Sequence, residues 1–230
     1  MNQYIWNAGV NMKIIVAPDS FKGSLTSLQA TSAIERGIKK AASTYKETVE
    51  IVKIPMADGG EGTVKSVISA VGGRIVSTKV VNPLGRQIES FYGILPDNTA
   101  IIEMAAASGL DLIKPIERNP ILTTSFGTGQ LIKAAMDHGC KRIILGIGGS
   151  ATNDGGAGMC QALGIRFIDN NGKDIGFGGG ELGKIQRIDI SGIDPRIAEI
   201  SLTVASDVQN VLCGENGASA VYGPQKGASL

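Results

Sequence analysis

A short apolar run passes directly into a glycine-rich loop in the stretch Lys141-Arg-Ile-Ile-Leu-Gly-Ile-Gly-Gly-Ser-Ala-Thr-Asn-Asp-Gly-Gly156. The run Lys141–Leu145 is continuous and rich in isoleucine, which predicts a buried strand of a parallel sheet. The loop offers many backbone N–H groups, and loops of this kind after a strand can cradle phosphates. A helix is expected over Gly155–Leu163, and strand, loop and helix in this order indicate an α/β fold.

The same order occurs earlier in the chain. Lys13–Pro18 reads as a buried strand stopped by proline, and Thr26–Ala42 as a helix whose Thr26 and Gln29 have capping-box spacing. A strand over Val49–Pro55 and a helix closed by Gly72-Gly73 follow. Strand, helix, strand and helix in sequence predict a parallel, Rossmann-like sheet.

The pattern changes after Gly73. Ile75–Val81 and Gln87–Leu95 read as strands joined by the turn Asn82-Pro-Leu-Gly85, which predicts that the two strands pair antiparallel. Further elements are expected at Thr99–Met104 (strand), Thr128–His138 (helix), Asn170-Asn-Gly172 (hairpin turn) and Ile200–Ala205 (strand). The sequence therefore predicts two α/β units with a boundary near Gly73, one with a parallel sheet and one with a mixed sheet.

Composition narrows the class of protein. Lys plus Arg number 22 and Asp plus Glu 21, so no overall field favours nucleic acid or a membrane surface, and an anionic ligand must be held locally. Three cysteines without paired spacing argue against a disulfide framework and a zinc site, and fit a cytoplasmic protein. We find no membrane span, and we interpret Met1–Asn11 as a leader before a start at Met12.

Four loops that each follow a strand carry the candidate chemistry, because the carboxyl ends of parallel strands form the ligand crevice of α/β folds. They are residues 19–24, 57–63, 146–156 and 206–226. Ser20, Lys22 and Ser24 suit a carboxylate or phosphate, although helix starts also use such residues. Asp58 and Glu61 precede a helix, where an acid could orient a hydroxyl, hold magnesium or simply cap the turn.

The sequence patterns of other enzyme classes fit less well. Gly146, Gly148 and Ala151, with Asp169 downstream, match a loose dinucleotide fingerprint, but Thr152–Gly156 separates them from the next helix. No Walker A or protein-kinase signature occurs. The single histidine, His138, is expected to be a helix-end residue rather than part of a catalytic triad.

Five segments together closely resemble the bacterial glycerate kinase family: Ala17–Ser24, Ala57–Thr63, Thr124–Gly129, Gly148–Gly156 and Tyr222–Ala228. The resemblance implies ATP- and Mg²⁺-dependent phosphorylation of D-glycerate to phosphoglycerate. It also implies a Rossmann-like domain, built from both ends of the family chain, that carries an inserted mixed α/β domain. The corresponding ranges here are 12–75 and 76–230. Val211 stands where the family has proline, and we expect family chains to continue beyond Leu230.

The resemblance and the loop chemistry suggest roles for particular residues. Ser20 and Lys22, with Ser24 and Glu61, are expected to hold glycerate, and either Asp58 or Asp207 to orient or deprotonate its hydroxyl, with Lys22 assisting catalysis. ATP phosphates are expected at Gly148, Gly149, Ser150, Thr152 and Asn153, and magnesium at Asp154. An inactive fragment and a nucleotide-binding oxidoreductase remain alternatives. Self-association into a homo-oligomer stays open.

Overall fold

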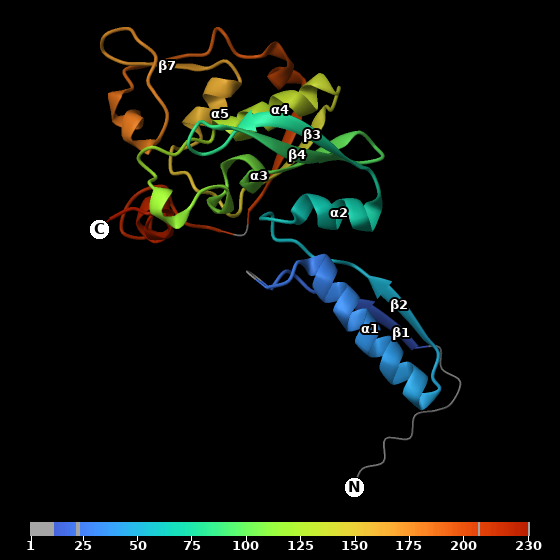
Figure 1. The fold of residues 1–230 in the computed structure, drawn as a ribbon. Coiled ribbons are helices and arrows are strands. Elements are labelled where there is room, and N and C mark those ends of the chain that lie inside the picture. Colours follow the sequence, from blue (N-terminus) through green and yellow to red (C-terminus); the bar gives the residue numbers. More distant parts are fainter. Residues whose placement is uncertain (1–11, 22–23, 207, 230) are drawn as a thin grey trace. The chain divides into compact units, whose positions relative to one another are not determined.

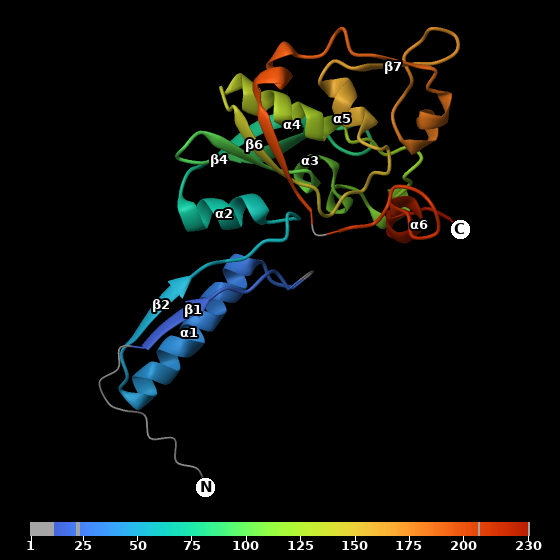
Figure 2. The same ribbon diagram turned by 180° about the vertical axis from the view of Figure 1, so that it is seen from behind.

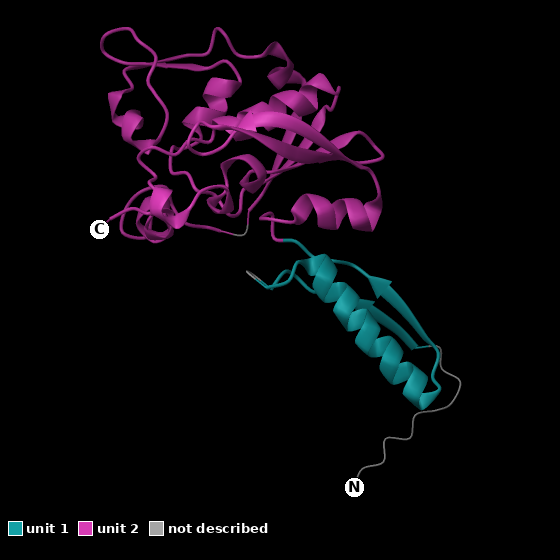
Figure 3. Cartoon of the chain, viewed as in Figure 1, with its two compact units in different colours: residues 1–57 teal, residues 58–230 magenta. Residues whose placement is uncertain are grey.

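The computed structural model describes residues 12–21, 24–206 and 208–229. The chain divides into two compact units, Met1–Ala57 and Asp58–Leu230, which Figure 3 shows in teal and magenta. Each unit contains its own sheet.

The first unit is a strand–helix–strand motif. Strands β1 (Met12–Val16) and β2 (Val49–Lys53) pair in parallel, and α1 (Ser27–Tyr45) connects them and packs on both (Figure 1). The predicted capping box is confirmed, because the Thr26 hydroxyl accepts from the Gln29 N–H at 3.2 Å and the Gln29 side chain accepts from the Thr26 N–H at 2.9 Å. Two orphan N–H groups of the helix start are thereby satisfied.

The second unit is built on a mixed five-stranded sheet in the order β3-β4-β5-β6-β9. Its strands are β3 (Arg74–Val81), β4 (Gln87–Ile94), β5 (Thr99–Glu103), β6 (Arg142–Gly146) and β9 (Ser201–Ala205). The pairs β3–β4 and β4–β5 are antiparallel, whereas β5, β6 and β9 run parallel. The α/β class with one parallel and one mixed sheet is therefore confirmed.

Helices cover both faces of this sheet (Figures 1 and 2). Tyr92 and Ile94 of β4 belong to the main core, together with Leu131 and Ile132 of α4 (Phe126–Asp137). Gly93, between them, faces the side chains of α2 (Thr63–Val71). Because successive strand residues point to opposite faces, α4 and α2 lie on opposite sides of the sheet.

Shorter elements complete the second unit. They are α3 (Ala105–Ser108), α5 (Ala157–Ala162), α6 (Ala218–Tyr222), an antiparallel pair of β7 (Arg166–Ile168) with β8 (Arg187–Asp189), and 3₁₀ turns at Leu110–Leu112, Pro115–Glu117, Gly179–Lys184, Pro195–Glu199 and Pro224–Lys226. The turn predicted at residues 170–172 is confirmed, since the Asp169 N–H donates to the Lys173 carbonyl at 2.8 Å.

The predicted element boundaries differ from the observed ones by a few residues. The largest difference is at the end of α1, which runs to Tyr45 rather than Ala42, and α4 begins at Phe126 rather than Thr128. Helix α2 packs on β3, β4 and β5 and so belongs to the second compact unit. The domain ranges 12–75 and 76–230 concern the two-domain arrangement of the family and stay a prediction. Among the described helices, none is both long and apolar enough to cross a membrane.

Candidate phosphoryl-transfer site

Two of the predicted loops meet at the carboxyl ends of the parallel strands of the second unit. Gly146 ends β6, and a Cβ built on it would overlap the carbonyl oxygen of Gly59. The Gly148 N–H donates to that same carbonyl at 3.2 Å. Only glycine permits so close a backbone approach. The structure thereby brings the Asp58 loop beside the glycine-rich loop, as expected for a crevice at this edge of the sheet.

Backbone hydrogen bonds fix part of the glycine-rich loop, while other N–H groups of the loop stay open. The Ala151 N–H donates to the Ser108 carbonyl at 2.9 Å, and the Gly149 carbonyl accepts from Leu110 at 3.0 Å. The N–H groups of Gly149, Ser150 and Asn153, by contrast, have no acceptor among the described residues, and these three residues are exposed or half-buried. Open N–H groups on a fixed loop are the donors that an anion needs.

Side chains of the loop are used differently from one another. The Ser150 hydroxyl accepts from the Thr152 N–H at 3.0 Å and lies 2.9 Å from the Thr152 hydroxyl, so these two residues stiffen the turn. The Asn153 amide donates to the Ser219 hydroxyl at 2.9 Å. Binding of ATP phosphates by Gly148, Gly149, Ser150, Thr152 and Asn153 stays a prediction.

Asp154, predicted as a magnesium ligand, lies 2% exposed between two helix starts. Its Oδ2 accepts from the Ser125 N–H and hydroxyl, each at 2.8 Å, and from the Gly158 N–H at 3.2 Å. Its Oδ1 accepts from the Gly156 N–H at 3.1 Å. These bonds join the start of α4 to the start of α5, which favours a positioning role and leaves little free coordination for a metal. The magnesium role remains a prediction.

Glu103 is a buried acid that the sequence analysis did not single out. It ends β5, is 1% exposed, and accepts from the Gly62 N–H at 3.2 Å and the Val64 N–H at 2.5 Å. Burial raises the pKa of this carboxyl, while the two N–H bonds work in the opposite direction. Glu103 therefore caps α2 and fixes the Asp58–Gly62 loop. The sequence signal that could have identified Glu103 is a single acid at the end of the short, mainly apolar strand β5.

Glu61 shares its site with a second carboxyl. A hydrogen bond to Asp111, together with partial burial, raises the pKa of Glu61. Two carboxyls in contact cannot both ionise cheaply, so they share a proton or attract a cation. Lys65 lies close enough to oppose the shift. Among the described residues, no group of three or more His, Cys, Asp or Glu side chains could hold a metal ion.

The remaining predicted residues are placed as follows. Asp58 is exposed and accepts from the Gly60 N–H at 2.9 Å. Ser20 and Ser24 belong to the first unit, in a turn closed by the Ser24 N–H donating to the Phe21 carbonyl at 2.7 Å. Lys22 and Asp207 lie outside the described residues.

The dinucleotide alternative fits the geometry poorly. The Gly146 backbone is in contact with Gly59, and α5 begins only at Ala157. Asp169 accepts from the N–H groups of Asn171 and Lys173 and thereby closes its own turn. It is not aimed at a ribose, as that fingerprint would require.

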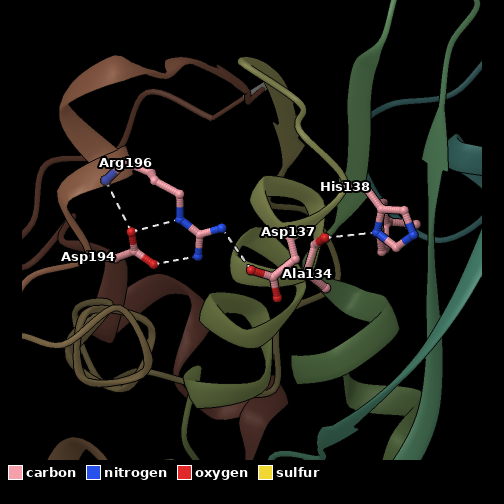
Figure 4. A network of polar contacts seen from close by, with 6 residues as sticks. Ala134, Asp137, His138, Asp194 and Arg196 are labelled. Carbon is pink, nitrogen blue, oxygen red and sulfur yellow. Dashed lines mark hydrogen bonds and ion pairs between the residues drawn. The ribbon is translucent and has the colours of Figure 1, made fainter.

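A hollow lies between α4, the end of α5 and the segment that precedes β9. Its volume is about 440 Å³, and Lys133, Leu163, Gly192 and Arg196 are among its lining residues. Figure 4 shows that Arg196 is already engaged, with Asp194 at 2.6 Å and Asp137 at 2.8 Å. His138, also in Figure 4, caps α4 and lies 2.7 Å from the Tyr92 hydroxyl, as expected for a helix-end residue. Lys133, which also lines the hollow, forms no salt bridge among the described residues, although it lies near enough to Asp194 to lower the pKa of that carboxyl.

Comparison with known proteins identifies the family of the chain. The sequence model of the glycerate kinase family matches residues 14–230. The chain is 56% identical to a glycerate kinase of Haemophilus influenzae and 52% identical to a glycerate 2-kinase of Escherichia coli, over 95% of its own length in both cases. A crystal structure from Salmonella typhimurium LT2, named as a candidate glycerate kinase 2, superposes with a TM-score of 0.83 at 52% identity over 95% of this chain.

The relatives are longer than this chain. The alignments cover 57% of the Haemophilus influenzae protein, 56% of the Escherichia coli protein and 58% of the Salmonella typhimurium chain. The chain thus spans a little over half the length of the relatives that it matches. With a family match over nearly all of its residues and identities above half, the chain belongs to the glycerate kinase family.

Proposed function

We propose that this protein transfers the γ-phosphoryl group of ATP to a hydroxyl of D-glycerate, forming phosphoglycerate and ADP. The observation that carries the proposal is the glycine-rich loop after β6, whose N–H groups at Gly149, Ser150 and Asn153 are open, in contact with the loop that carries Asp58. Phosphoryl transfer depends mainly on such fixed donors and on an acceptor hydroxyl placed in line.

Asp58 or Asp207 acts as the base in this proposal. The hydroxyl proton passes to the carboxylate as the hydroxyl oxygen bonds to phosphorus and the bond to ADP breaks. The exposed Asp58 side chain belongs to a loop that Glu103 fixes through a hydrogen bond from the Gly62 N–H. The loop therefore holds Asp58 in a defined position. Ser20, Lys22 and Ser24 are proposed to bind the glycerate carboxylate, and Glu61 is proposed as a further substrate-binding residue.

Magnesium accompanies the nucleotide in this proposal. Mg²⁺ is usually held by one or two carboxylates together with substrate phosphates and waters. Asp154 suits this poorly, because its oxygens already accept four hydrogen bonds. The carboxyls of Glu61 and Asp111 suit it better, because a cation would relieve their mutual repulsion. When bound, the ion would neutralise charge on the transferring group.

The acceptor is proposed to be the 2-hydroxyl, on the ground that the Escherichia coli relative is named glycerate 2-kinase. Glycerate is the proposed small-molecule partner, with no nucleic acid and no membrane as ligands. The cytoplasm is the proposed compartment, because ATP is supplied there. A homo-oligomer stays open.

A coupled assay of ADP release tests the proposal. The protein is given ATP and magnesium with and without D-glycerate, and the product is identified by ³¹P NMR. Glycerate-dependent ADP release with 2-phosphoglycerate as product is expected. ATP binding without any turnover would favour the second candidate, a ligand-binding fragment. Binding of NADH, followed by its fluorescence, would favour the oxidoreductase alternative.

A further inference from the structure

Two cations near the glycine-rich loop, Lys226 and Arg118, form no salt bridge among the described residues, although the Asp154 carboxylate acts on Lys226 electrostatically. Lys226 donates from Nζ to the Thr152 carbonyl at 2.6 Å. Arg118 forms no ion pair in the described part of the chain, and its Nε is buried without a hydrogen-bond partner. It is the one buried side-chain nitrogen or oxygen of the described residues in that condition. Arg118 as a whole is half-buried, but a buried charged donor atom without a partner is costly, so its Nε favours the binding of an acceptor there.

Backbone contacts place these two residues together. Gly227, which follows Lys226, adopts φ +94°, and a Cβ built on it would overlap the carbonyl oxygen of Arg118 and lie 3.1 Å from its Cβ. The segments that carry the two cations are both bonded to the loop. Thr123 donates to the Ala151 carbonyl at 2.8 Å, and Ser219 accepts from Asn153 at 2.9 Å.

The other arginines near this sheet show what pairing looks like. Arg86 lies 2.9 Å from Glu117, Arg142 lies 2.8 Å from Asp97, and Arg196 contacts both Asp194 and Asp137 (Figure 4). Arg118 directly follows Glu117, but that carboxylate is taken by Arg86. Burial lowers the pKa of Lys226, and the nearby Asp154 carboxylate opposes this shift in part, as a bound anion would.

We propose that Arg118 and Lys226 form a positive wall at the glycine-rich loop and bind the phosphate groups of the donor nucleotide. A guanidinium presents a planar fork that matches phosphate oxygens, and the lysine adds a point charge. The open N–H groups of Gly149, Ser150 and Asn153 supply neutral donors to the same anion. The assignment deepens the proposed kinase function and rests on it for the identity of the nucleotide.

Isothermal titration with tripolyphosphate, ATP, adenosine and D-glycerate tests the inference on the whole chain. Arg118→Gln and Lys226→Met are each expected to weaken tripolyphosphate and ATP binding about tenfold or more, as the loss of a charge-assisted hydrogen bond implies. Adenosine and D-glycerate affinities should not change. Arg118→Lys keeps the charge without the fork, so its affinity for tripolyphosphate should lie between those of the wild type and Arg118→Gln.

Matched controls are Arg74→Gln and Lys173→Met, which remove exposed cations at the start of β3 and in the turn after β7. These should bind tripolyphosphate as the wild type does. Should Arg118→Gln unfold below the titration temperature, Lys226→Met and Arg118→Lys decide.

Three results would overturn the inference. The first is wild-type affinity for tripolyphosphate in both Lys226→Met and Arg118→Lys. The second is that the unchanged chain does not bind tripolyphosphate. The third is that the variants lose affinity for D-glycerate alone, which would make the ligand a carboxylate. Failure of the kinase proposal is separate, because it would appear as intact phosphate binding without glycerate-dependent ADP release.

Discussion

The arginines at the two ends of the parallel strands β5, β6 and β9 differ in whether they form salt bridges. Before the strands, Arg142 is bonded to Thr99 and Asp97, and Arg196 to Asp194 and Asp137. After the strands, Arg118 and Lys226 form no salt bridge among the described residues, only Asp154 acts on Lys226 electrostatically, and loop N–H groups remain open. Charges that are paired within the protein need no ligand. The difference supports the proposal that the ligand binds at the edge where Arg118 forms no salt bridge, although the hollow of about 440 Å³ is lined by the paired Arg196.

The strongest test of the ligand edge is Asp58→Asn. If Asp58 is the base, the variant should lower turnover in the ADP-release assay about 100-fold or more, in line with typical general-base contributions. Its melting temperature should be kept, because Asp58 is exposed and an amide oxygen can still accept from Gly60. Asp174→Asn, which loses an exposed ion pair with Arg166, is the control. Normal turnover in Asp58→Asn would leave the base role to Asp207.

Asp154→Asn separates a positioning role from a metal role. The substitution replaces one carboxylate oxygen by an NH₂ group, which cannot accept a hydrogen bond. Depending on which oxygen is replaced, the NH₂ group faces the N–H groups of Ser125 and Gly158 or the N–H group of Gly156. We expect a loss of about 2 kcal/mol in the free energy of unfolding, measured by urea titration without magnesium. A variant of unchanged stability, but with weaker magnesium binding, would restore Asp154 as a metal ligand.

Gly149→Ala tests the loop itself. Its φ of +72° strains any residue with a Cβ, and the nearest atom to that Cβ would be the Ala105 Cβ at 3.4 Å. We expect ATP affinity to fall about tenfold as the loop shifts its open N–H groups. Gly172→Ala carries the same strain at φ +76° in a distant turn and should leave ATP affinity unchanged. If Gly149→Ala bound ATP as tightly as Gly172→Ala, the loop would have no part in binding ATP and would only connect β6 to α5.

Arg142→Gln should have the smallest effect. Its ion pair with Asp97 is more than half exposed, and exposed pairs contribute little to stability. Nucleotide affinity and turnover should match the wild type in the same titration and assay. A large loss of ATP binding would break the contrast between the two ends of the strands.

Much of the fold followed from local pattern. The capping box at Thr26 and Gln29, the antiparallel pair around Asn82–Gly85 and the strand before Gly146 were all predicted from residues close together in the sequence. These features depend on helix-end N–H groups, turn geometry and continuous apolar runs, which a few neighbouring residues define. The motifs of the second and third loops likewise identified the edge of the sheet at which the candidate site lies.

Partners that lie far apart in the chain could not be read in this way. Glu103 caps a helix start 39 and 41 residues earlier, and Asp154 bonds to Ser125, 29 residues before it. The contact of Arg118 with Gly227 spans a still longer separation. A carboxylate or guanidinium has the same appearance in a sequence whether its hydrogen bonds are satisfied or not. The sequence by itself determined the elements, the loops and the family. Only the tertiary structure decided which charges are already paired and which remain for a ligand, because packing selects hydrogen-bond partners among residues that no local pattern connects.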